Sequence, residues 1–288
     1  MSTNVGTSTV GSADKVQPAP RPGEARARGT SIALAPLAVA LAVAGAVLAR
    51  DAGDSANEVL RAALVSAWAV AGAMITGRRH HERMGPLVLA GSLVAGVAAL
   101  AAGAVRASGH GTDVAAGLVS AARLALPLAV SLLPAIGMQM LLSLPDGSCR
   151  VSRALIRGAY VVGAVLGVVL WTSRPDLPLW PVGLEAMLAA AVGLAGSNRR
   201  YRLSTGVERQ RLQWFGWAVV VAAEVTLITV ALRLLAGWPP GGVVVVGAAT
   251  VAIPVALAVS SSSRLLGRVD RLLAHTVSTV GLSGVVVA

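Results

Sequence analysis

Glu224 is the residue with the most chemical potential in this sequence, because it is a carboxylic acid near the middle of a long apolar run. An ionised carboxylate at the centre of a bilayer costs about 2.5–3.5 kcal/mol on insertion scales. We therefore expect Glu224 to be protonated, to be paired, or to face a wet cavity. One interpretation makes it a candidate intramembrane signal site. The other makes it a neutral carboxyl bonded to a neighbouring helix, and the sequence leaves both open.

Glu185 and Arg233 are a candidate structural pair. Each lies about four residues from the end of one of two consecutive antiparallel apolar runs, so we expect them at similar depth in a membrane. Arg233 comes nine residues after Glu224. At 3.6 residues per turn this spacing puts the two side chains on opposite faces of one helix, so they cannot pair with each other.

No set of residues in the sequence is arranged for catalysis. His80, His81 and Glu82 are adjacent in a basic loop and lack a defined metal geometry. The sequence contains no glycine-rich phosphate loop before a helix and no Ser/His/Asp or Cys/His set. We therefore expect no catalytic, metal or cofactor site, and Cys149, the only cysteine, excludes an internal disulfide.

The composition points to an all-α membrane protein with several spans. Of the 288 residues 55% are hydrophobic and only 13% are charged, which is too apolar for a soluble domain of this size. Lipid offers no partner for a bare peptide group, so spans must be helices or closed barrels, and strict alternation typical of barrel strands is missing. Abundant Ala and Gly suit close helix packing.

The net charge of +11 does not indicate a nucleic-acid partner. The arginines fall in short loops between apolar runs rather than on one face, so the partner they imply is the lipid bilayer. Eight apolar runs are near or above the length of a span. They cover residues 32–49, 59–76, 86–105, 124–144, 158–172, 182–196, 214–236 and 243–260.

The loops between these runs predict the orientation. If the N-terminus is cytoplasmic, 18 of the 24 Lys and Arg residues lie in the tail and inner loops and three lie in outer loops. This asymmetry is the positive-inside pattern, and it predicts a plasma-membrane protein with a cytoplasmic N-terminus. Arg61 and Arg123 lie at span edges, and we expect their side chains to reach the outer interface.

The two ends of the chain have their own character. Residues 1–31 are rich in Ser, Thr, Gly, Pro and Ala, which predicts a disordered cytoplasmic tail before a membrane domain at 32–260. Residues 276–288 are uncharged but fewer than the about 20 that a span requires. We interpret them as the truncated start of a ninth span.

Between these regions, residues 261–275 predict a cytoplasmic amphipathic linker. Leu266 and Leu273 belong to one apolar helical stripe, and Asp270 lies off it. A helix of this kind suits the inner membrane surface, and Leu266, Asp270 and Leu273 are the candidate linker residues. The simpler alternative is a plain basic loop.

Small residues and prolines within the runs carry weaker signals. Gly163 and Gly167 form a GxxxG spacing that allows two helices to approach closely, although generic packing explains it equally well. Three prolines inside the runs are potential helix breaks: Pro127, Pro134 and Pro254.

Three segments in the second half resemble the N-terminal multi-span membrane region of actinobacterial sensor histidine kinases of two-component systems. They are LLSLPDG (141–147), GVERQRLQW (206–214) and LLGRVDRLLAHTVSTVGLSG (265–284). Leu144 replaces the aromatic residue that the family has before PDG. The kinase domain is absent from the sequence, so the resemblance assigns no catalytic residue here.

The resemblance implies a membrane sensor or anchor region that passes a membrane or small-molecule signal to a cytoplasmic output. It implies a homodimer and a cytoplasmic kinase or response regulator as candidate protein partners. Two alternatives remain open, a small-molecule membrane transporter and a non-catalytic membrane scaffold.

Overall fold

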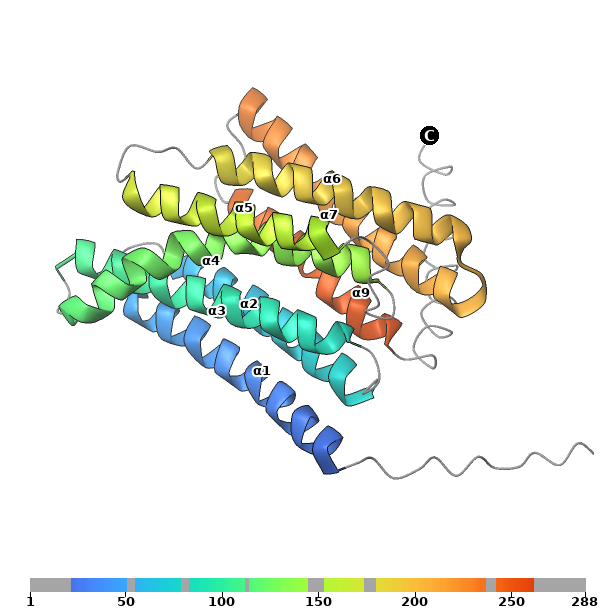
Figure 1. Cartoon of the computed structure of the whole chain (residues 1–288). Coiled ribbons are helices and arrows are strands. Elements are labelled where there is room, and N and C mark those ends of the chain that lie inside the picture. Colours follow the sequence, from blue (N-terminus) through green and yellow to red (C-terminus); the bar gives the residue numbers. More distant parts are fainter. Residues whose placement is uncertain are drawn as a thin grey trace, which may run out of the picture.

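The computed structural model describes residues 22–50, 55–78, 83–111, 114–144, 153–173, 180–236 and 242–261. Over these ranges the chain is helical apart from short connections, which confirms the all-α prediction (Figure 1). The helices are α1 (Pro22–Leu48), α2 (Ser55–Arg78), α3 (Met84–Gly109), α4 (Ala116–Ser143), α5 (Arg153–Thr172), α6 (Trp180–Leu203), α7 (Gly206–Ala236), α8 (Gly242–Thr250) and α9 (Ala252–Ser260).

Six of these helices, α2 to α7, are long and apolar enough to cross a membrane. Two shorter apolar segments accompany them, Ile32–Leu48 within α1 and Val244–Ser260 across α8 and α9. The chain is therefore a multi-pass membrane protein. The prediction of eight full spans is corrected to six long helices and two shorter apolar segments in the described part of the chain.

The eighth predicted span is interrupted. The apolar run 243–260 was expected to be one helix, but Val251 separates α8 from α9. The backbone of Val251 itself stays in the right-handed helical region (φ −62°, ψ −24°), and the irregularity lies beside Pro254, which has no N–H to donate to the carbonyl of Thr250. Pro127 and Pro134 lie inside the continuous helix α4, so the same residue type breaks only one of the runs.

Several helices extend beyond the apolar runs that predicted them. α1 begins at Pro22, inside the tail that was expected to be disordered. α6 and α7 continue through the basic loop predicted between them, leaving only Ser204 and Thr205 as a connection. An apolar run marks only the part of a helix that crosses lipid, and the helix can continue beyond it as polar turns in water. The length of an apolar run therefore underestimates the length of the helix. Gly206 has φ +60° at this turn, a conformation that glycine adopts without steric cost.

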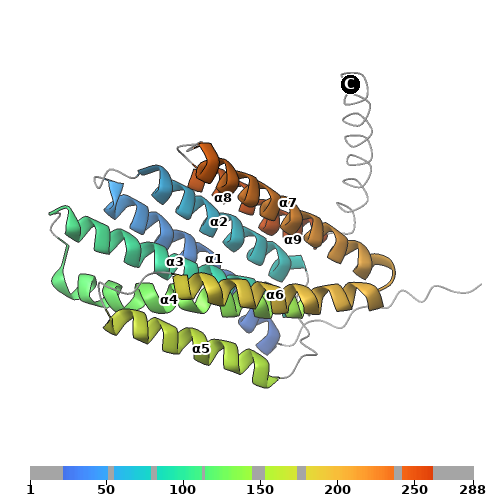
Figure 2. The same ribbon diagram turned by 90° about the horizontal axis from the view of Figure 1, so that it is seen from above.

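The helices alternate in direction between two ends of the bundle. We call the end where α2 begins and α3 finishes the Glu58 end, and the end where α4 finishes the Leu144 end. α3 packs against α1, α2 and α4, while α4 also packs against α5 and α6. α7, α8 and α9 form a second group that contacts α2, and Figure 2 shows this group on the side of the molecule opposite α5.

Small residues bring the helix backbones close together. A Cβ built on Gly96 of α3 would lie 2.7 Å from the carbonyl oxygen of Ala38 in α1, and Gly103 meets Gly45 in the same way about two turns further along the pair. On α5, a Cβ at Gly163 would lie 2.6 Å from the carbonyl oxygen of Ser131 in α4. These contacts confirm the close helix packing that the abundance of Ala and Gly predicted. The GxxxG pair, Gly163 and Gly167, lies at the contact between α5 and α4.

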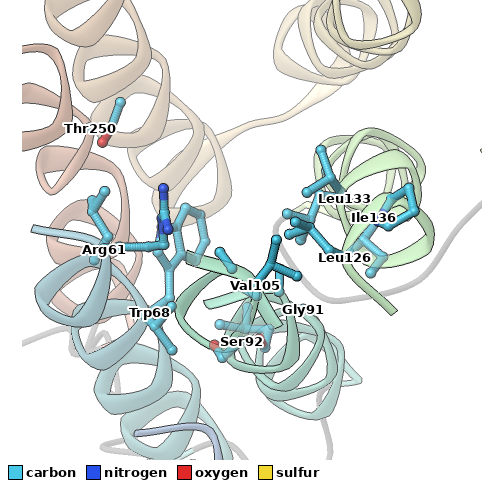
Figure 3. Close-up of a pocket in the computed structure, with 18 of the residues that line it drawn as sticks. Arg61, Trp68, Gly91, Ser92, Val105, Leu126, Leu133, Ile136 and Thr250 are labelled. Atoms are coloured by element: carbon cyan, nitrogen blue, oxygen red, sulfur yellow. Dashed lines mark hydrogen bonds between the residues drawn. The ribbon is translucent and has the colours of Figure 1, made fainter. Parts of the chain in front are cut away.

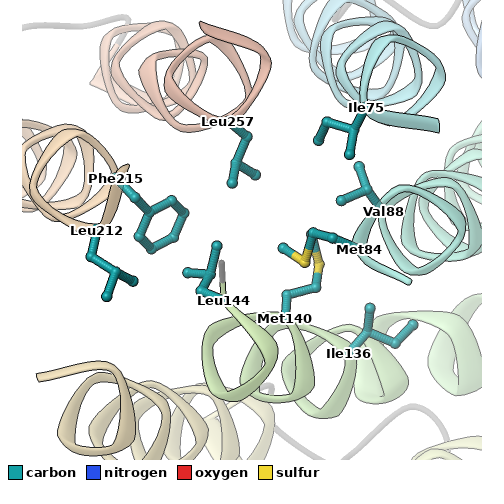
Figure 4. Close-up of a cluster of buried hydrophobic side chains, with 9 residues drawn as sticks. All are labelled: Ile75, Met84, Val88, Ile136, Met140, Leu144, Leu212, Phe215 and Leu257. Atoms are coloured by element: carbon teal, nitrogen blue, oxygen red, sulfur yellow. The ribbon is translucent and has the colours of Figure 1, made fainter. Parts of the chain in front are cut away.

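A cluster of buried side chains joins the two helix groups at the Leu144 end (Figure 4). We call it the junction cluster. Met140 and Leu144 come from α4, Phe215 from α7 and Leu257 from α9, and all are largely buried. The other members are Ile75, Met84, Val88, Ile136 and Leu212.

Candidate functional site

A cavity of about 900 Å³ opens between α2, α3 and α4. Leu170 of α5 and Thr250 of α8 complete its lining, so it lies where the two helix groups face each other (Figure 3). Its volume is at the upper end of the range of roughly 300–1,000 Å³ typical of small-molecule sites. The sequence did not predict this cavity, because it arises from how the helices pack.

The cavity is long and mostly apolar. Its α3 lining runs from Val88 to Arg106, which at 1.5 Å per residue is about 27 Å along the helix axis. This length is close to the ~30 Å of a bilayer's hydrocarbon core. Apart from the arginines at the Glu58 end, Ser92 and Thr250 are the hydroxyl-bearing residues among the described residues of its lining. Their hydroxyls donate to the carbonyls of Val88 (2.9 Å) and Gly247 (2.7 Å) in their own helices.

An ion-pair cluster forms the Glu58 end of the cavity. Glu58 in the first turn of α2 is 2% exposed. The Arg61 guanidinium donates through Nη1 to Glu58 Oε1 at 3.0 Å and Oε2 at 3.1 Å. Arg106 in the last turn of α3 also pairs with Glu58 Oε1. Glu58 and Arg106 each lie at the helix end whose dipole favours their charge, and their ion pair ties α2 to α3.

Arg123 adds a third guanidinium from α4. Arg123 is exposed and lines the cavity. Within the described ranges it makes no hydrogen bond or ion pair. The three arginines of this end, Arg61, Arg106 and Arg123, face one carboxylate. Among the described residues that form this mouth, the basic side chains therefore outnumber the acidic ones.

Sequence reasoning missed this site for a specific reason. Glu58 and Arg106 were assigned to outer loops, and Arg61 and Arg123 were expected to reach the interface singly. One signal was present, because Glu58 and Arg61 are three residues apart and would share a face if the helix started early enough. The predicted span began at Val59, one residue too late to include the acid.

The other end of the cavity is continuous with the junction cluster. Val88, Ile136 and Met140 line the cavity and belong to that cluster. Gly137 lies beside them, and a Cβ built there would meet nothing within 4 Å. The α4 side of this end is therefore open enough to take a larger side chain.

Glu224 lies elsewhere. It is exposed on α7 and does not line the cavity. Its assignment as a candidate intramembrane signal site stays a prediction.

Glu185 and Arg233 are not brought together as an ion pair. Glu185 is half-buried, with Oε1 3.1 Å from the position of a Cβ on Gly163, and Arg233 is exposed on α7. Equal depth did not make them neighbours because α6 packs mainly along α4 rather than α7. In the described residues Glu185 Oε2 is buried without a hydrogen-bond partner.

The remaining candidate residues lie outside the described residues. These are Leu266, Asp270 and Leu273 of the linker, Cys149, and the loop residues His80, His81 and Glu82. Within the described ranges, no three His, Cys, Asp or Glu side chains gather into a group that could hold a metal ion.

Two of the three segments that carry the sequence resemblance meet at the Leu144 end. Arg200 of α6 donates to the carbonyl of Leu144 in the middle of the first segment. The Arg209 guanidinium of the second segment lies 5.0 Å from the ring centroid of Tyr201 in α6, and Gln213 donates to the Tyr201 hydroxyl at 3.0 Å. The two segments therefore belong to one structural unit with the end of α6.

No protein-family model, curated protein or solved structure matches the chain.

Proposed function

We propose that this chain is the sensor and anchor region of a histidine-kinase-like signalling protein. In this proposal the cavity receives the input, and the junction cluster passes it to a cytoplasmic output. The observation that carries the proposal is that the cavity and the cluster share three residues. Val88, Ile136 and Met140 line the cavity and also belong to the junction cluster. Packed side chains of this kind shift between discrete arrangements rather than deforming continuously.

The cluster leads to the segment that would carry the output. Leu257 of α9 is a cluster member, and α9 finishes one turn later. There Arg78 of α2 donates to the Ser261 hydroxyl at 3.4 Å. The predicted linker 261–275 starts at this residue, so a change at the cavity wall would reach it through one helix.

The charge distribution supports a cytoplasmic Leu144 end and a plasma-membrane location. Described arginines are more numerous there than at the Glu58 end, as the positive-inside rule requires of the cytoplasmic side. Those at the Leu144 end are Arg26, Arg28, Arg78, Arg83, Arg153, Arg157, Arg199, Arg200, Arg202, Arg209 and Arg211, and those at the Glu58 end are Arg50, Arg61, Arg106, Arg123 and Arg233.

The sequence resemblance supports the kind of output. Its first two segments meet in the unit formed by Leu144, Tyr201 and Arg209, beside the junction cluster. The partners that this function requires are the bilayer and a cytoplasmic kinase or response regulator, with a homodimer as the assembly typical of that family.

A distance measurement tests the coupling. Spin labels are placed on cysteines at Arg83 of α3 and Val255 of α9, both exposed, with Cys149 changed to Ser. Gly137→Leu then fills the cavity wall as an occupant would. Because helix shifts at packed interfaces are about 1–2 Å, we expect the distance distribution between the labels to move by that amount.

The matched control is Gly117→Leu, which adds the same side chain to the same helix in open space away from the cavity. It should leave the distribution unchanged. If Gly137→Leu also leaves it unchanged in a folded protein, the cavity is not coupled to α9 and the sensor proposal is wrong.

A second function, small-molecule transport, is favoured by one observation. The break between α8 and α9 lies next to Thr250, which lines the cavity, and interrupted helices at a mid-membrane site are typical of transporters. Alternating access predicts that Met140→Cys at the inner end reacts with an impermeant thiol reagent from the cytoplasmic side, and that Leu126→Cys reacts from the outer side. A sensor predicts reaction at Leu126→Cys only.

A further inference from the structure

We propose that the cavity binds an amphiphile with one anionic head group and one apolar chain. The head group would lie among Arg61, Arg106 and Arg123, and the chain would extend along α3 and α4 toward Met140. This inference rests on the proposed function, because it names the chemical class of the input that the cavity receives.

The mouth selects for negative charge. Arg61 and Arg106 both contact Glu58, whereas Arg123 has no ion-pair partner in the described part of the chain. A guanidinium presents a fork of N–H donors that matches carboxylate and phosphate oxygens. Near lipid the local dielectric is low, so an anion gains more here than in water, and a cation would be repelled.

The rest of the cavity selects for an apolar chain. The hydroxyls of Ser92 and Thr250 are already committed to carbonyls of their own helices, so they add little for a polar ligand. The remaining wall carries aliphatic and aromatic side chains, with Trp68, Leu126 and Leu133 among them. Figure 3 shows Leu126 and Leu133 on α4 across from Trp68 on α2. Burying an apolar chain against this wall contributes about 0.8 kcal/mol per methylene group.

The length of the cavity and the position of its arginines both match an elongated molecule with its charge at one end. All three arginines lie at one end of a lining about 27 Å long, and the opposite end adjoins the junction cluster through the residues that the two share. A molecule that is charged at one end and apolar over the rest matches this polarity, whereas a compact polar solute would leave most of the wall unfilled. The shared chemistry is an anion on an acyl chain, either the carboxylate of a fatty acid or the phosphate of a lipid.

Quenching of Trp68 measures this binding directly. A variant that retains Trp68, with the other five tryptophans changed to Phe, is purified in an uncharged detergent and titrated with dibrominated probes. The probes are dibromostearate, a dibrominated monoacyl phosphate and the neutral dibromostearyl alcohol. We expect saturable quenching by at least one anionic probe at a concentration about tenfold lower than the alcohol requires. Which anion binds more tightly distinguishes a carboxylate from a phosphate source.

Paired variants assign the two subsites. Arg123→Gln should reduce the preference for the anion to about threefold or less without changing the affinity for the alcohol, and Arg123→Lys should restore it. Arg233→Gln, an exposed arginine of α7 away from the cavity, should change nothing. Gly137→Leu should weaken all three probes about tenfold, and Gly117→Leu should weaken none.

Equal quenching by the anions and the alcohol, unaffected by Arg123→Gln, would overturn the anionic head group. Quenching that does not saturate, or that Gly137→Leu does not weaken, would overturn occupation of the cavity. Both results come from binding alone. If the distance measurement showed no coupling between the cavity and α9, these binding results would still stand. The proposed ligand class and the proposed sensor function can therefore be contradicted independently of each other.

Discussion

Glu58 is the residue on which the cavity mouth depends, because its carboxylate contacts an arginine of its own helix and one of the next helix. Removing the acid leaves two guanidiniums without their common partner. The cost is about 1–3 kcal/mol for a buried group deprived of its hydrogen bonds. Both arginine side chains are 35% exposed, so screening by water places the cost at the lower part of that range.

We therefore expect Glu58→Gln to lower the thermal unfolding midpoint in detergent while raising the affinity of Trp68 quenching by dibromostearate, since the mouth gains positive charge. The control is Glu208→Gln, an exposed acid in the first turn of α7, which should change neither. A loss of stability together with weaker anion binding would contradict the charge argument.

The sequence identified the costly acids but not their surroundings. Glu224, Glu185 and Arg233 stood out because each is charged within an apolar run. Partner choice depends on which helices are adjacent, and neither depth nor spacing contains that information. Glu58 was not singled out because the apolar run begins one residue after it, which placed it in a loop. A charged residue in a loop is ordinary and indicates no site.

Gly206 is the feature of the α6–α7 connection that a substitution can test. Its φ of +60° costs an L-residue roughly 1–2 kcal/mol. Gly206→Ala should thus lower the free energy of unfolding by about 1 kcal/mol. Gly216→Ala, later in α7 with open space around it, should be neutral or slightly stabilising because alanine favours helices. Equal effects in the two variants would show that the turn does not depend on glycine.

The α1–α3 contact makes a second element-scale prediction. Gly96→Val would push its side chain against the backbone of Ala38, and overpacking of this kind costs about 1–3 kcal/mol. We expect a lower unfolding midpoint and loosening of α1, measured as faster proteolysis near its start. Gly117→Val on the open face of α4 serves as the control, and a midpoint equal to that of the control would contradict close packing of the pair.

The elements were predictable to the extent that they are apolar. Seven of the eight runs became single helices, because no open-chain alternative satisfies the backbone in lipid. The eighth run is divided at Val251, three residues before Pro254, whereas Pro127 and Pro134 left α4 continuous. Proline identifies a weak point, but packing around the helix decides whether it breaks.

At the scale of the whole molecule, the orientation remains a prediction that labelling checks. With Cys149 changed to Ser, Gly109→Cys at the Glu58 end should react in intact cells with an impermeant thiol reagent. Arg202→Cys at the Leu144 end should react only after permeabilisation. Both positions are exposed, so accessibility within the protein is matched. Reversed labelling would invert the membrane orientation and with it the direction of signalling.

The cavity itself belongs to this scale, and no pattern in the sequence predicted it. Trp68, Gly91 and Leu126 are unremarkable apolar residues in their own helices. They enclose a space because, in the described part of the chain, α8 and α9 pack on α2 while the backbone of α4 approaches none of α7, α8 and α9 closely. Gaps between packed helices depend on all the contacts at once, so one sequence does not reveal them.

The interruption at Val251 has a mechanical consequence for the protein in a bilayer. α8 and α9 have nine residues each, which is about 13.5 Å per helix, or close to the thickness of one leaflet of a ~30 Å hydrocarbon core. A continuous helix would average the lateral pressure of both leaflets along one rigid rod. At Val251 the backbone stays helical, but Pro254 removes one hydrogen bond from the ladder, and a helix bends most easily where its ladder is incomplete. Asymmetry between the leaflets therefore acts first on the bend of the chain at this position, next to Thr250 in the cavity wall.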